Sequence, residues 1–251
     1  MVSLGKETDG AEALQSSLPT WVGGVMISVI IPVYDEEVVL PTTLDHVNHQ
    51  AGEFEIIVVD GGSHDRTCDI VSRYPEVQLL HAAKGRASQM NAGAGVARGE
   101  WLLFLHADTL LPPQALSTLN ALEADQTYQT GGFRQRFSGD DWRLRLISFL
   151  HNFRCQRTRI MYGDQALFVR QALFNRLHGF PDQPILEDVA FGEKLLLITR
   201  PVLLDDYVIT DSRKFEKIGI WRSFARVLAI LIRHRLGLSV APSHPFFKDI
   251  R

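Results

Sequence analysis

The chain has 251 residues, of which 45% are hydrophobic and 22% are charged, and its formal net charge is −3. This is the composition of an ordinary globular protein, long enough for one large α/β domain or two small ones, and the charge gives no argument for nucleic-acid binding. The two cysteines, Cys68 and Cys155, are too few and too far apart for a disulfide framework, which predicts a cytoplasmic location.

The two ends of the chain and its apolar runs bear on membrane insertion. Residues 1–24 lack the cationic start and apolar core of a secretory signal, so we expect a flexible tail there. The longest uninterrupted apolar run, Val227 to Ile232, has six residues, whereas roughly 20 are needed to span a bilayer. The sequence therefore predicts no membrane-spanning helix.

The first half of the chain alternates between strand and helix patterns. Residues 27–34 are β-branched and predict a buried strand. Asp35, Glu36 and Glu37 follow, and they favour the first turn of a helix that runs to about residue 50. Ser63 is the expected N-cap of the next helix. Further strands are expected at 55–59, 77–81 and 101–105, and further helices at 63–74 and 86–97. This alternation predicts βαβ units in a largely parallel sheet.

The pattern of the second half is less regular. Pro112 and Pro113 precede an expected helix to about residue 124. A half-exposed strand is then expected, followed by an apolar helical stripe that begins at Trp142, and by a helix that begins at Leu186. The expected elements are strands at 131–137, 202–204 and 207–210, a mixed segment at 161–169, and helices at 142–153, 171–177, 186–198 and 217–235.

Three separated acids fall at the ends of expected elements: Asp60, Asp108 and Asp188. In an open α/β sheet, ligands collect at the carboxyl ends of the strands. Asp108 closes the polar tip that follows the buried strand 101–105, where a hard cation can bridge phosphate oxygens. Asp60 is suited to contact a nucleobase or ribose, and Asp188 to take a proton from an attacking hydroxyl. We therefore expect the three carboxylates to converge on one cleft that holds a sugar diphosphate.

Four ordered motifs carry a resemblance to a known family. They are PVYDE at 32–36, VVDGGSHDRT at 58–67, KGRASQMNAGAGVARGEWLLFLHADT at 84–109 and LEDV at 186–189. Together they resemble family 2 glycosyltransferases, over roughly residues 27–200. The His106-Ala107-Asp108 tip, the 163–165 segment and the basic C-terminal helix look most like the bacterial branch described as arsenosugar-biosynthesis or selenodomain-associated transferases.

The resemblance implies the GT-A fold, a Rossmann-like α/β fold with a mostly parallel central sheet flanked by helices. It implies an inverting, hexosyltransferase-type transfer from a UDP-sugar to a hydroxyl acceptor, with Asp188 as the general base. Asp108 would bind Mg²⁺ or Mn²⁺ against the diphosphate. The residues implied at the nucleotide and substrate sites are Pro32, Tyr34, Glu36, Asp60, Arg86, Asn91, His106, Asp108, Gln165 and Glu187.

Two positions depart from the family pattern. Gly61 stands where the family often has a second acid, so this chain lacks one of the two carboxylates expected to contact the nucleobase. His106 stands where the family has the first carboxylate of Asp-x-Asp. Because imidazole is a softer ligand than carboxylate for Mg²⁺ or Mn²⁺, His106 is either a metal ligand or a residue that orients the ribose.

Simpler interpretations exist for several of these residues. Asp108 can cap the turn that follows it, Arg86 can be a solvated helix start, and Gln165 can satisfy a buried backbone group instead of lining an acceptor pocket. The apolar stripe at 142–153 can be core packing. A nucleotidyltransferase would instead carry a glycine-rich basic loop after the first strand, and residues 33–37 are acidic and lack glycine. A non-catalytic nucleotide-sugar binding module is the third alternative.

Basic residues gather in the C-terminal third. Residues 143–159 include five arginines and no acid, and residues 213–235 include seven Lys/Arg and one acid, Glu216. Such helices lie on anionic membrane surfaces or bind phosphate, for which Arg213 and Lys214 are candidates. We expect a domain at 25–212, with a nucleotide-binding half at 25–110 and an acceptor half at 111–212. A basic amphipathic helix and tail are expected at 213–251.

Overall fold

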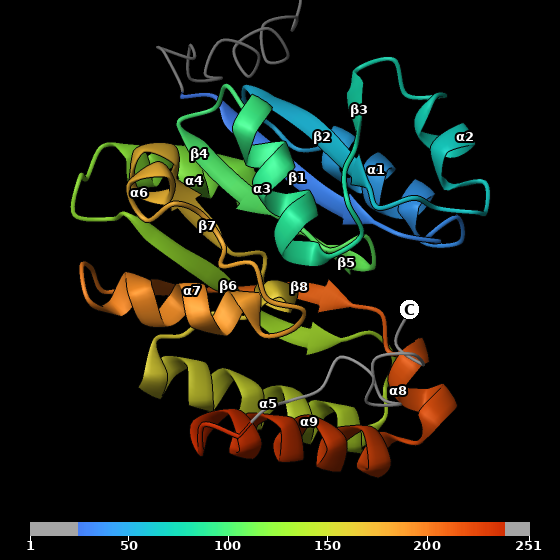
Figure 1. Cartoon of the computed structure of the whole chain (residues 1–251), viewed down its shortest axis with the longest axis vertical. Helices are drawn as coiled ribbons and strands as arrows, with labels where there is room; N and C mark the ends of the chain where they lie inside the picture. The colour runs from blue at the N-terminus through green and yellow to red at the C-terminus, as the bar shows by residue number, and fades with distance from the viewer. Residues whose placement is uncertain (1–24, 239–251) are drawn as a thin grey trace, which may run out of the picture.

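The first of the predicted buried strands is β1 (Ile27–Val33), which lies between two other strands in the sheet. It pairs in parallel with β2 (Phe54–Asp60) and β4 (Trp101–Phe104), and β2 pairs in parallel with β3 (Val77–His81). The computed structural model describes residues 25–238, so the tails expected at 1–24 and beyond 238 lie outside the described residues. Figure 1 shows these four strands in the upper half of the molecule.

The second half of the sheet is mixed, whereas the strands of the first half are parallel, as expected. β7 (Phe168–Arg170) is antiparallel to both β4 and β6 (Thr130–Phe137). β8 (Val202–Thr210) is parallel to β6, and the short β5 (Thr109–Leu110) is antiparallel to β8. The strand order is β3-β2-β1-β4-β7-β6-β8-β5. The two strand pieces expected after residue 202 form one strand, with a register irregularity opposite Phe133 and Arg134.

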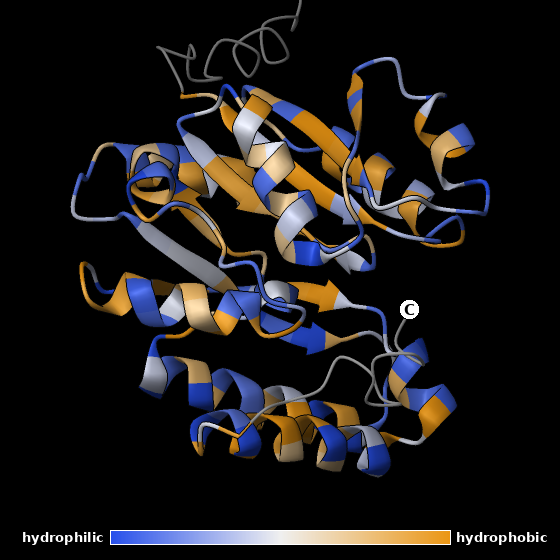
Figure 2. Ribbon diagram, viewed as in Figure 1, coloured by the Kyte–Doolittle hydropathy of each residue, from blue (hydrophilic) through white to orange (hydrophobic). Residues whose placement is uncertain are grey.

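Successive strand residues point to opposite faces, so the buried strands supply two hydrophobic cores. Ile27, Val29 and Ile31 pack on the side of α1 (Leu40–Asn48), α2 (Thr67–Val71) and α4 (Ala115–Glu123). Ile30 and Ile57 pack on the other side, with α3 (Arg86–Val96), α6 (Gln171–Arg176) and α7 (Glu187–Leu196). The buried strands are the most hydrophobic ribbons in Figure 2.

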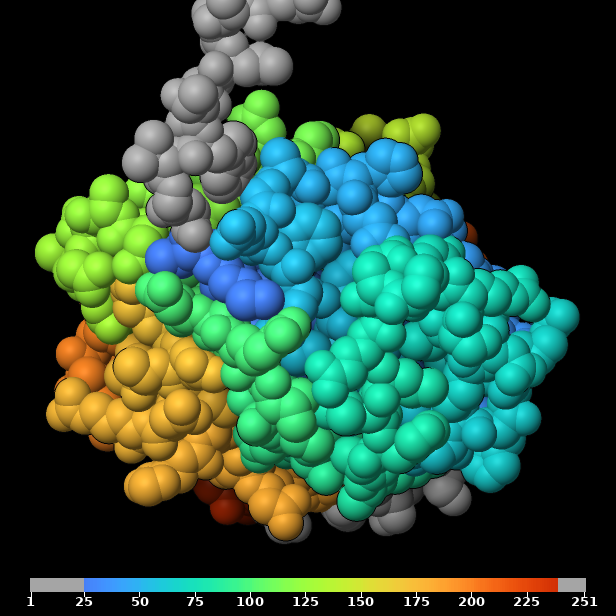
Figure 3. Space-filling view, turned by 90° about the horizontal axis from the view of Figure 1, so that it is seen from above, coloured from blue at the N-terminus to red at the C-terminus, as the bar shows by residue number. Residues whose placement is uncertain are grey.

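Close packing explains one of the two glycines within α3. A Cβ at Gly93 would lie 2.6 Å from Cγ2 of Ile30, so only glycine lets α3 approach β1 this closely. On its other side α3 is tied to the segment after α6, because the Asn91 amide exchanges two hydrogen bonds with the backbone of Phe180. Seen from above, the green residues of α3 accordingly lie between the blue and cyan residues that precede them in the chain and the orange residues of this segment (Figure 3).

Two helix starts differ from the predictions. α1 begins at Leu40, and Asp35, Glu36 and Glu37 lie in the loop before it, with Asp35 at a φ of 54°. α2 begins at Thr67, so Ser63 is not its N-cap. The Ser63 hydroxyl instead accepts from the Asp35 N–H. The two loops are cross-linked by hydrogen bonds that a local pattern does not reveal.

The C-terminal helices form a layer of their own on one side of the sheet. α5 (Trp142–Thr158) lies beside α9 (Ile220–Arg235) in Figure 1. The helix expected at 217–235 is interrupted: α8 (Arg213–Ile218) ends at Gly219, whose φ of 99° suits glycine, and α9 follows. Within residues 25–238, no helix combines the length and apolarity that crossing a bilayer requires.

Candidate active site

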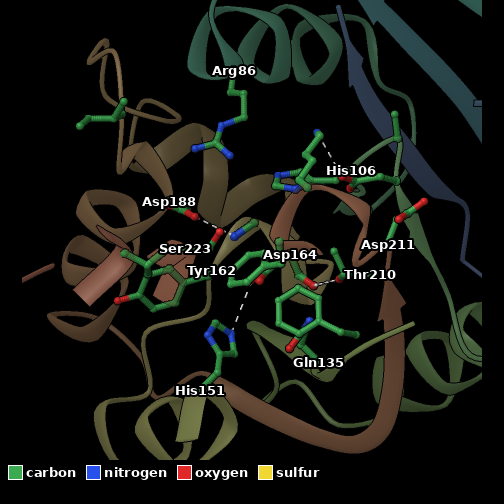
Figure 4. A pocket seen from close by; sticks show the side chains of 18 of the residues that line it. Arg86, His106, Gln135, His151, Tyr162, Asp164, Asp188, Thr210, Asp211 and Ser223 are labelled. Carbon is green, nitrogen blue, oxygen red and sulfur yellow. Dashed lines mark hydrogen bonds and ion pairs between the residues drawn. The ribbon is translucent and has the colours of Figure 1, made fainter. Parts of the chain in front are cut away.

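One cavity of about 490 Å³ lies at the carboxyl ends of β1 and β4. The loop after β1, the start of α3, the tip of β4, the start of α7 and the end of β8 all contribute to its wall. Figure 4 shows Arg86, His106, Asp164, Asp188 and Asp211 around this space. The site therefore occupies the position at which an open α/β sheet collects ligands.

Asp188 is held in the first turn of α7. Its Oδ2 accepts the Gly163 N–H at 2.7 Å, and its Oδ1 accepts the Val189 N–H at 2.8 Å. The carboxylate is buried, yet it borders the cavity. A negative charge is favourable at a helix N-terminus. Asp188 is thus a fixed carboxylate with acceptor positions available to a molecule in the cavity.

His106 and Asp188 meet at the short 3₁₀ helix η1 (Gly163–Gln165). A Cβ at Gly163 would lie 2.5 Å from His106 Nε2 and 3.5 Å from Asp188 Oδ2, so the chain needs glycine at this position. His106 Nε2 is buried, and no described residue hydrogen-bonds to it. Burial lowers the pKa of His106, as does Arg86, against the opposing effect of nearby carboxylates. Burial thus favours the neutral form of His106, and its Nε2 is unpaired among the described residues.

Asp108 and Glu36 share one cation in this structure. The Lys214 ammonium lies 3.3 Å from an Asp108 carboxylate oxygen and 3.6 Å from one of Glu36. Burial raises the pKa of Glu36, Lys214 lowers it, and the Asp108 charge raises it further. Two carboxylates close enough to share an ammonium ion offer the hard oxygen donors that Mg²⁺ and Mn²⁺ prefer. Asp211 also borders the cavity and donates its backbone N–H to the Asp108 carbonyl.

Arg86 and Glu187 form an ion pair at the edge of the site. Arg86 Nε lies 2.8 Å from Glu187 Oε1, and the Glu187 side chain is buried. Burial raises the pKa of Glu187, and the Arg86 charge opposes that effect. Arg86 borders the cavity, whereas Glu187 does not. Glu187 thus orients Arg86, although the Arg86 side chain is still 46% exposed at the start of α3.

Tyr34 and Lys84 lie at the end of the cavity near β1. Pro32 and Tyr34 line it, and the Lys84 ammonium lies 3.4 Å from the centre of the Tyr34 ring. A planar base that stacks on Tyr34 from this side would displace Lys84. The displaced ammonium would then be available to a phosphate group.

Two of the three carboxylates that sequence reasoning singled out, Asp108 and Asp188, line the cavity, and Asp60 does not. The Asp60 carboxylate is buried and accepts hydrogen bonds from the backbone N–H groups of Gly62 and Ser63 and from the Ser63 hydroxyl. Hydrogen bonding to these groups lowers the pKa of Asp60 in spite of its burial. In this structure Asp60 shapes its own loop at the end of β2.

Asn91 and Gln165 are also outside the cavity wall. Asn91 bonds to the Phe180 backbone, as described above. Gln165 is fully buried: it donates to the Phe133 carbonyl at 3.1 Å and accepts from the Tyr162 N–H at 3.0 Å. Their contacts favour structural roles, and for Gln165 this is the simpler of the two interpretations given by the sequence.

A separate group of possible metal ligands lies away from the cavity. One ligand atom each from Asp60, Cys68 and His81 fall within 4.8 Å of one another. None of the three lines the cavity, and the Asp60 oxygens already accept several hydrogen bonds. This group therefore gives no support to the metal expected at Asp108.

The cavity-wall residues that the sequence did not predict include a polar group at the acceptor side, formed by His151, Arg154, Tyr162 and Asp164. The Arg154 guanidinium lies 3.6 Å above the Tyr162 ring, and His151 Nε2 lies 3.5 Å from Asp164 Oδ1. Asp164 follows Gly163, so the Gly-Asp-Gln segment was the one available signal. The others sit on α5 and in the loop after it, and no local motif marks them.

Comparison with known proteins agrees with this geometry. The model of the family described as glycosyl transferase family 2 matches residues 28–176. A PGL/p-HBAD biosynthesis glycosyltransferase from Mycobacterium bovis (strain BCG / Pasteur 1173P2) is 42% identical over 211 residues, which cover 77% of this chain and 78% of the relative. An undecaprenyl-phosphate 4-deoxy-4-formamido-L-arabinose transferase from Aeromonas hydrophila is 30% identical over 157 residues, 58% of this chain and 48% of that protein.

Solved structures show the same fold. The mannosyltransferase PcManGT from Pyrobaculum calidifontis, in complex with GDP-Man and Mn²⁺, has a TM-score of 0.64 at 23% identity and covers 95% of this chain and 73% of its own. S. aureus TarS 1–349 in complex with UDP-GlcNAc has a TM-score of 0.60 at 22% identity and covers 75% of this chain and 59% of its own. The chain belongs to glycosyl transferase family 2 and is a glycosyltransferase with the GT-A fold.

Proposed function

We propose that this enzyme transfers a sugar, with inversion at the anomeric carbon and with the help of a divalent cation, from a nucleotide-diphospho-sugar to a hydroxyl group. The observation that carries the proposal is that Asp108 and Asp188, which are 80 residues apart in the sequence, line one cavity. One carboxylate is placed to hold a cation at the donor's diphosphate, and the other to accept a proton.

The residues divide into a leaving-group end and an acceptor end. Asp108 and Glu36 would hold Mg²⁺ or Mn²⁺, which supplies positive charge to the departing diphosphate. Lys214, now between these carboxylates, would turn to the diphosphate oxygens when the cation is bound. Asp188 takes the proton of the acceptor hydroxyl as its oxygen bonds to the anomeric carbon and the bond to the diphosphate breaks. His106, with its unused Nε2 beside Gly163, contacts the donor sugar or ribose.

The donor is proposed as a UDP-sugar on the strength of the family resemblance. Two structural neighbours were solved with UDP-GlcNAc and GDP-Man, which supports a nucleotide-sugar donor without selecting the base. Pro32 and Tyr34 would face the nucleotide. The expected contact between Asp60 and the base stays a prediction, as does the narrower assignment to the arsenosugar and selenodomain branch.

The alternatives from the sequence fare less well. A nucleotidyltransferase needs backbone N–H groups and a cation around a triphosphate after the first strand. Here the segment between β1 and α1 carries Asp35, Glu36 and Glu37, and no glycine. A binding module without catalysis has no need for a buried, hydrogen-bonded carboxylate at the acceptor end of the cavity.

Acceptor-free hydrolysis tests the proposal. Purified enzyme is incubated with Mn²⁺ and each member of a panel of nucleotide sugars, and the products are separated by chromatography. We expect slow release of nucleoside diphosphate from one donor, because water can replace the acceptor hydroxyl at Asp188. Release of pyrophosphate from a nucleoside triphosphate, with no nucleoside diphosphate from any sugar donor, would contradict it.

We further propose that the enzyme binds peripherally to an anionic membrane, on the cytoplasmic side that the cysteine content predicts. Large apolar side chains of α5 and α9 are exposed, including Trp142 at 61%, Phe149 at 65% and Trp221 at 45%. The Trp142 and Trp221 rings lie 6.1 Å apart, which joins the two helices into one surface. We call this surface the α5–α9 face; it consists of Trp142, Leu146, Phe149, Leu150, Phe153, Trp221, Leu228 and Ile232.

The charges on α5 and α9 also fit binding to an anionic membrane. α5 carries Arg143, Arg145 and Arg157 outside the cavity, and α9 carries Arg222, Arg226, Arg233 and Arg235. Neither helix contains an acidic residue. Basic amphipathic helices with tryptophan bind headgroups through charge and bury their apolar side chains at the acyl boundary.

Flotation on vesicles tests the membrane proposal. We expect the protein to float with phosphatidylglycerol vesicles at low salt and to float less at 1 M salt, because salt screens the attraction between the arginines and the anionic headgroups. Replacing Phe149 and Trp221 together by serine should lower the bound fraction about tenfold or more. Leu197→Ser, at an 86%-exposed site outside the face, is the matched control and should change nothing. Equal flotation of all three proteins would contradict the proposal.

A further inference from the structure

The cavity that contains Asp188 continues beyond it, between α5 and the C-terminal helices. Its wall there is apolar and comes from both helices and from α8. We call this part the apolar chamber and define it by six side chains: Ile147, Leu150, Phe215, Phe224, Val227 and Leu231. The chamber thus joins the polar part of the active site without a separating wall.

The chamber is unusual for a protein interior. Side chains of a folded core pack at crystal-like density, and few voids exceed a water molecule. Beneath α9, Ile220 and Ile147 form a small packed cluster with Leu144, but Val227 and Leu231 border open space. Apolar side chains around open space in continuity with a catalytic carboxylate are typical of a binding site for an apolar group.

A ring of polar groups lines the cavity between Asp188 and the chamber. His151 Nε2 and Asp164 Oδ1 are buried without hydrogen-bond partners, although they lie 3.5 Å apart as an ion pair. Arg154 Nε is likewise buried without a partner, and its guanidinium covers the Tyr162 ring. Figure 4 shows Tyr162 and Asp164 between Asp188 and His151. This ring offers donors and an acceptor to the polar end of a molecule whose remainder is apolar.

The chamber also reaches the surface. Leu150 of α5 and Leu228 of α9 line the cavity, and they are 40% and 46% exposed. Both belong to the α5–α9 face. An apolar path therefore runs from this exposed face, past Leu150 and Leu228, through the chamber and the polar ring, to Asp188.

We infer that the acceptor is a lipid alcohol whose hydroxyl reaches Asp188 and whose hydrocarbon chain lies in the apolar chamber and leaves between Leu150 and Leu228. This inference rests on the proposed function and adds the acceptor class. In the transfer, the alcohol oxygen bonds to the anomeric carbon, the bond from that carbon to the diphosphate oxygen breaks, and Asp188 takes the alcohol proton. A chain of isoprenoid or acyl type fills the chamber with the same apolar contacts.

Binding of alcohols of increasing chain length tests the inference. The dissociation constants of 1-butanol, geraniol and farnesol are measured by native mass spectrometry, and that of UDP with Mn²⁺ is measured by calorimetry on the same proteins. We expect farnesol to bind at least about tenfold more tightly than geraniol, because each buried methylene adds to affinity. Butanol should bind too weakly to detect.

Two variants narrow the chamber and one is a matched control. Leu231→Trp and Val227→Phe each fill part of the open space and should weaken farnesol binding at least about tenfold while UDP binding stays unchanged. Ala229→Trp adds an indole at an exposed position of α9 outside the cavity and should leave both constants unchanged. Thermal unfolding confirms that each variant is folded. If one narrowing variant does not fold, the other still tests the inference.

The outcomes separate the inference from the proposed function. If farnesol binds equally to wild type and to both narrowing variants, or if farnesol does not bind at all, the lipid acceptor is wrong even when UDP binds normally. If farnesol binding follows chain length and chamber volume but no nucleotide sugar binds, the proposed donor chemistry fails while the chamber stands as a lipid site.

Discussion

Asp188→Asn lowers the rate of sugar transfer, or of acceptor-free donor hydrolysis, about a thousandfold and leaves donor binding unchanged. Removing a general base costs about 10²–10⁴-fold, because the acceptor oxygen must then attack with its proton in place. The amide retains a carbonyl oxygen that can accept the Gly163 N–H, so the geometry at the start of α7 is preserved. Single-turnover rates and calorimetric donor affinity give the two quantities separately.

Asp164→Asn is the matched control for this change. Asp164 is a second carboxylate on the same cavity wall, one residue from Gly163, and its partner is His151. We expect this variant to lose less than about tenfold in hydrolysis rate, since its role concerns the acceptor. If Asp164→Asn were the inactive variant and Asp188→Asn turned over normally, the base would be Asp164.

Asp108→Ala removes the increase in donor affinity that Mn²⁺ produces. We expect the affinity for the nucleotide sugar in the presence of Mn²⁺ to fall about 10–100-fold, or roughly 1.4–2.7 kcal/mol, because the cation loses a carboxylate ligand beside the diphosphate. Without Mn²⁺ the variant should bind the donor as well as wild type or better. The reason is that Lys214 would lose one of its two carboxylate partners and face the diphosphate more freely.

Calorimetry with and without Mn²⁺ checks this pair of expectations. Asp206→Ala removes a carboxylate from an exposed position of β8 outside the cavity and serves as the control. It should keep the full effect of Mn²⁺. A wild-type-like response to Mn²⁺ in Asp108→Ala would show that the cation, if it acts at all, is held elsewhere.

The parts of the fold that the sequence predicted are those set by local patterns. β1, β2 and β4 consist of mostly β-branched or apolar residues that are buried on both faces, and the edge strand β3 is only partly buried. The predicted positions of all four strands were correct within one or two residues. The start of α1 was wrong because Asp35 and Glu37 satisfy backbone groups of another loop: Asp35 accepts the His64 N–H, and Glu37 accepts the Arg66 N–H. These partners lie 29 residues away, beyond the range of a helix-capping rule.

Strand pairings between distant segments explain why the sequence did not predict the arrangement of the second half of the chain. β6 pairs in parallel with β8, and β7 returns between β4 and β6 in the opposite direction. Nothing in the short strand β7 indicates that direction. The apolar stripe at 142–153 was open to interpretation as core packing, yet Trp142 and Phe149 are exposed while Leu144 and Ile147 are buried. One apolar side of α5 therefore faces solvent, and the other packs against the interior.

The candidate site was predictable where a residue sits at the end of a strand or the start of a helix. Asp108 and Asp188 occupy such positions, and the structure places both at the cavity. Lys214 was suggested by its charge, and the ion pairs with Glu36 and Asp108 give it a location. His151 and Arg154 were hidden in a basic helix because only the packing of α5 beside η1 and α9 brings them to the acceptor side.

The stereochemistry of acceptor-free hydrolysis tests the central claim most directly. The enzyme is mixed with Mn²⁺ and the α-linked nucleotide sugar that it hydrolyses, and proton NMR follows the anomer of the sugar released before mutarotation. Water activated by Asp188 on the face opposite the diphosphate should yield the β anomer first, together with nucleoside diphosphate. First appearance of the α anomer, or release of a sugar phosphate instead of free sugar, would contradict the assignment of Asp188 and Asp108 to the two sides of one displacement.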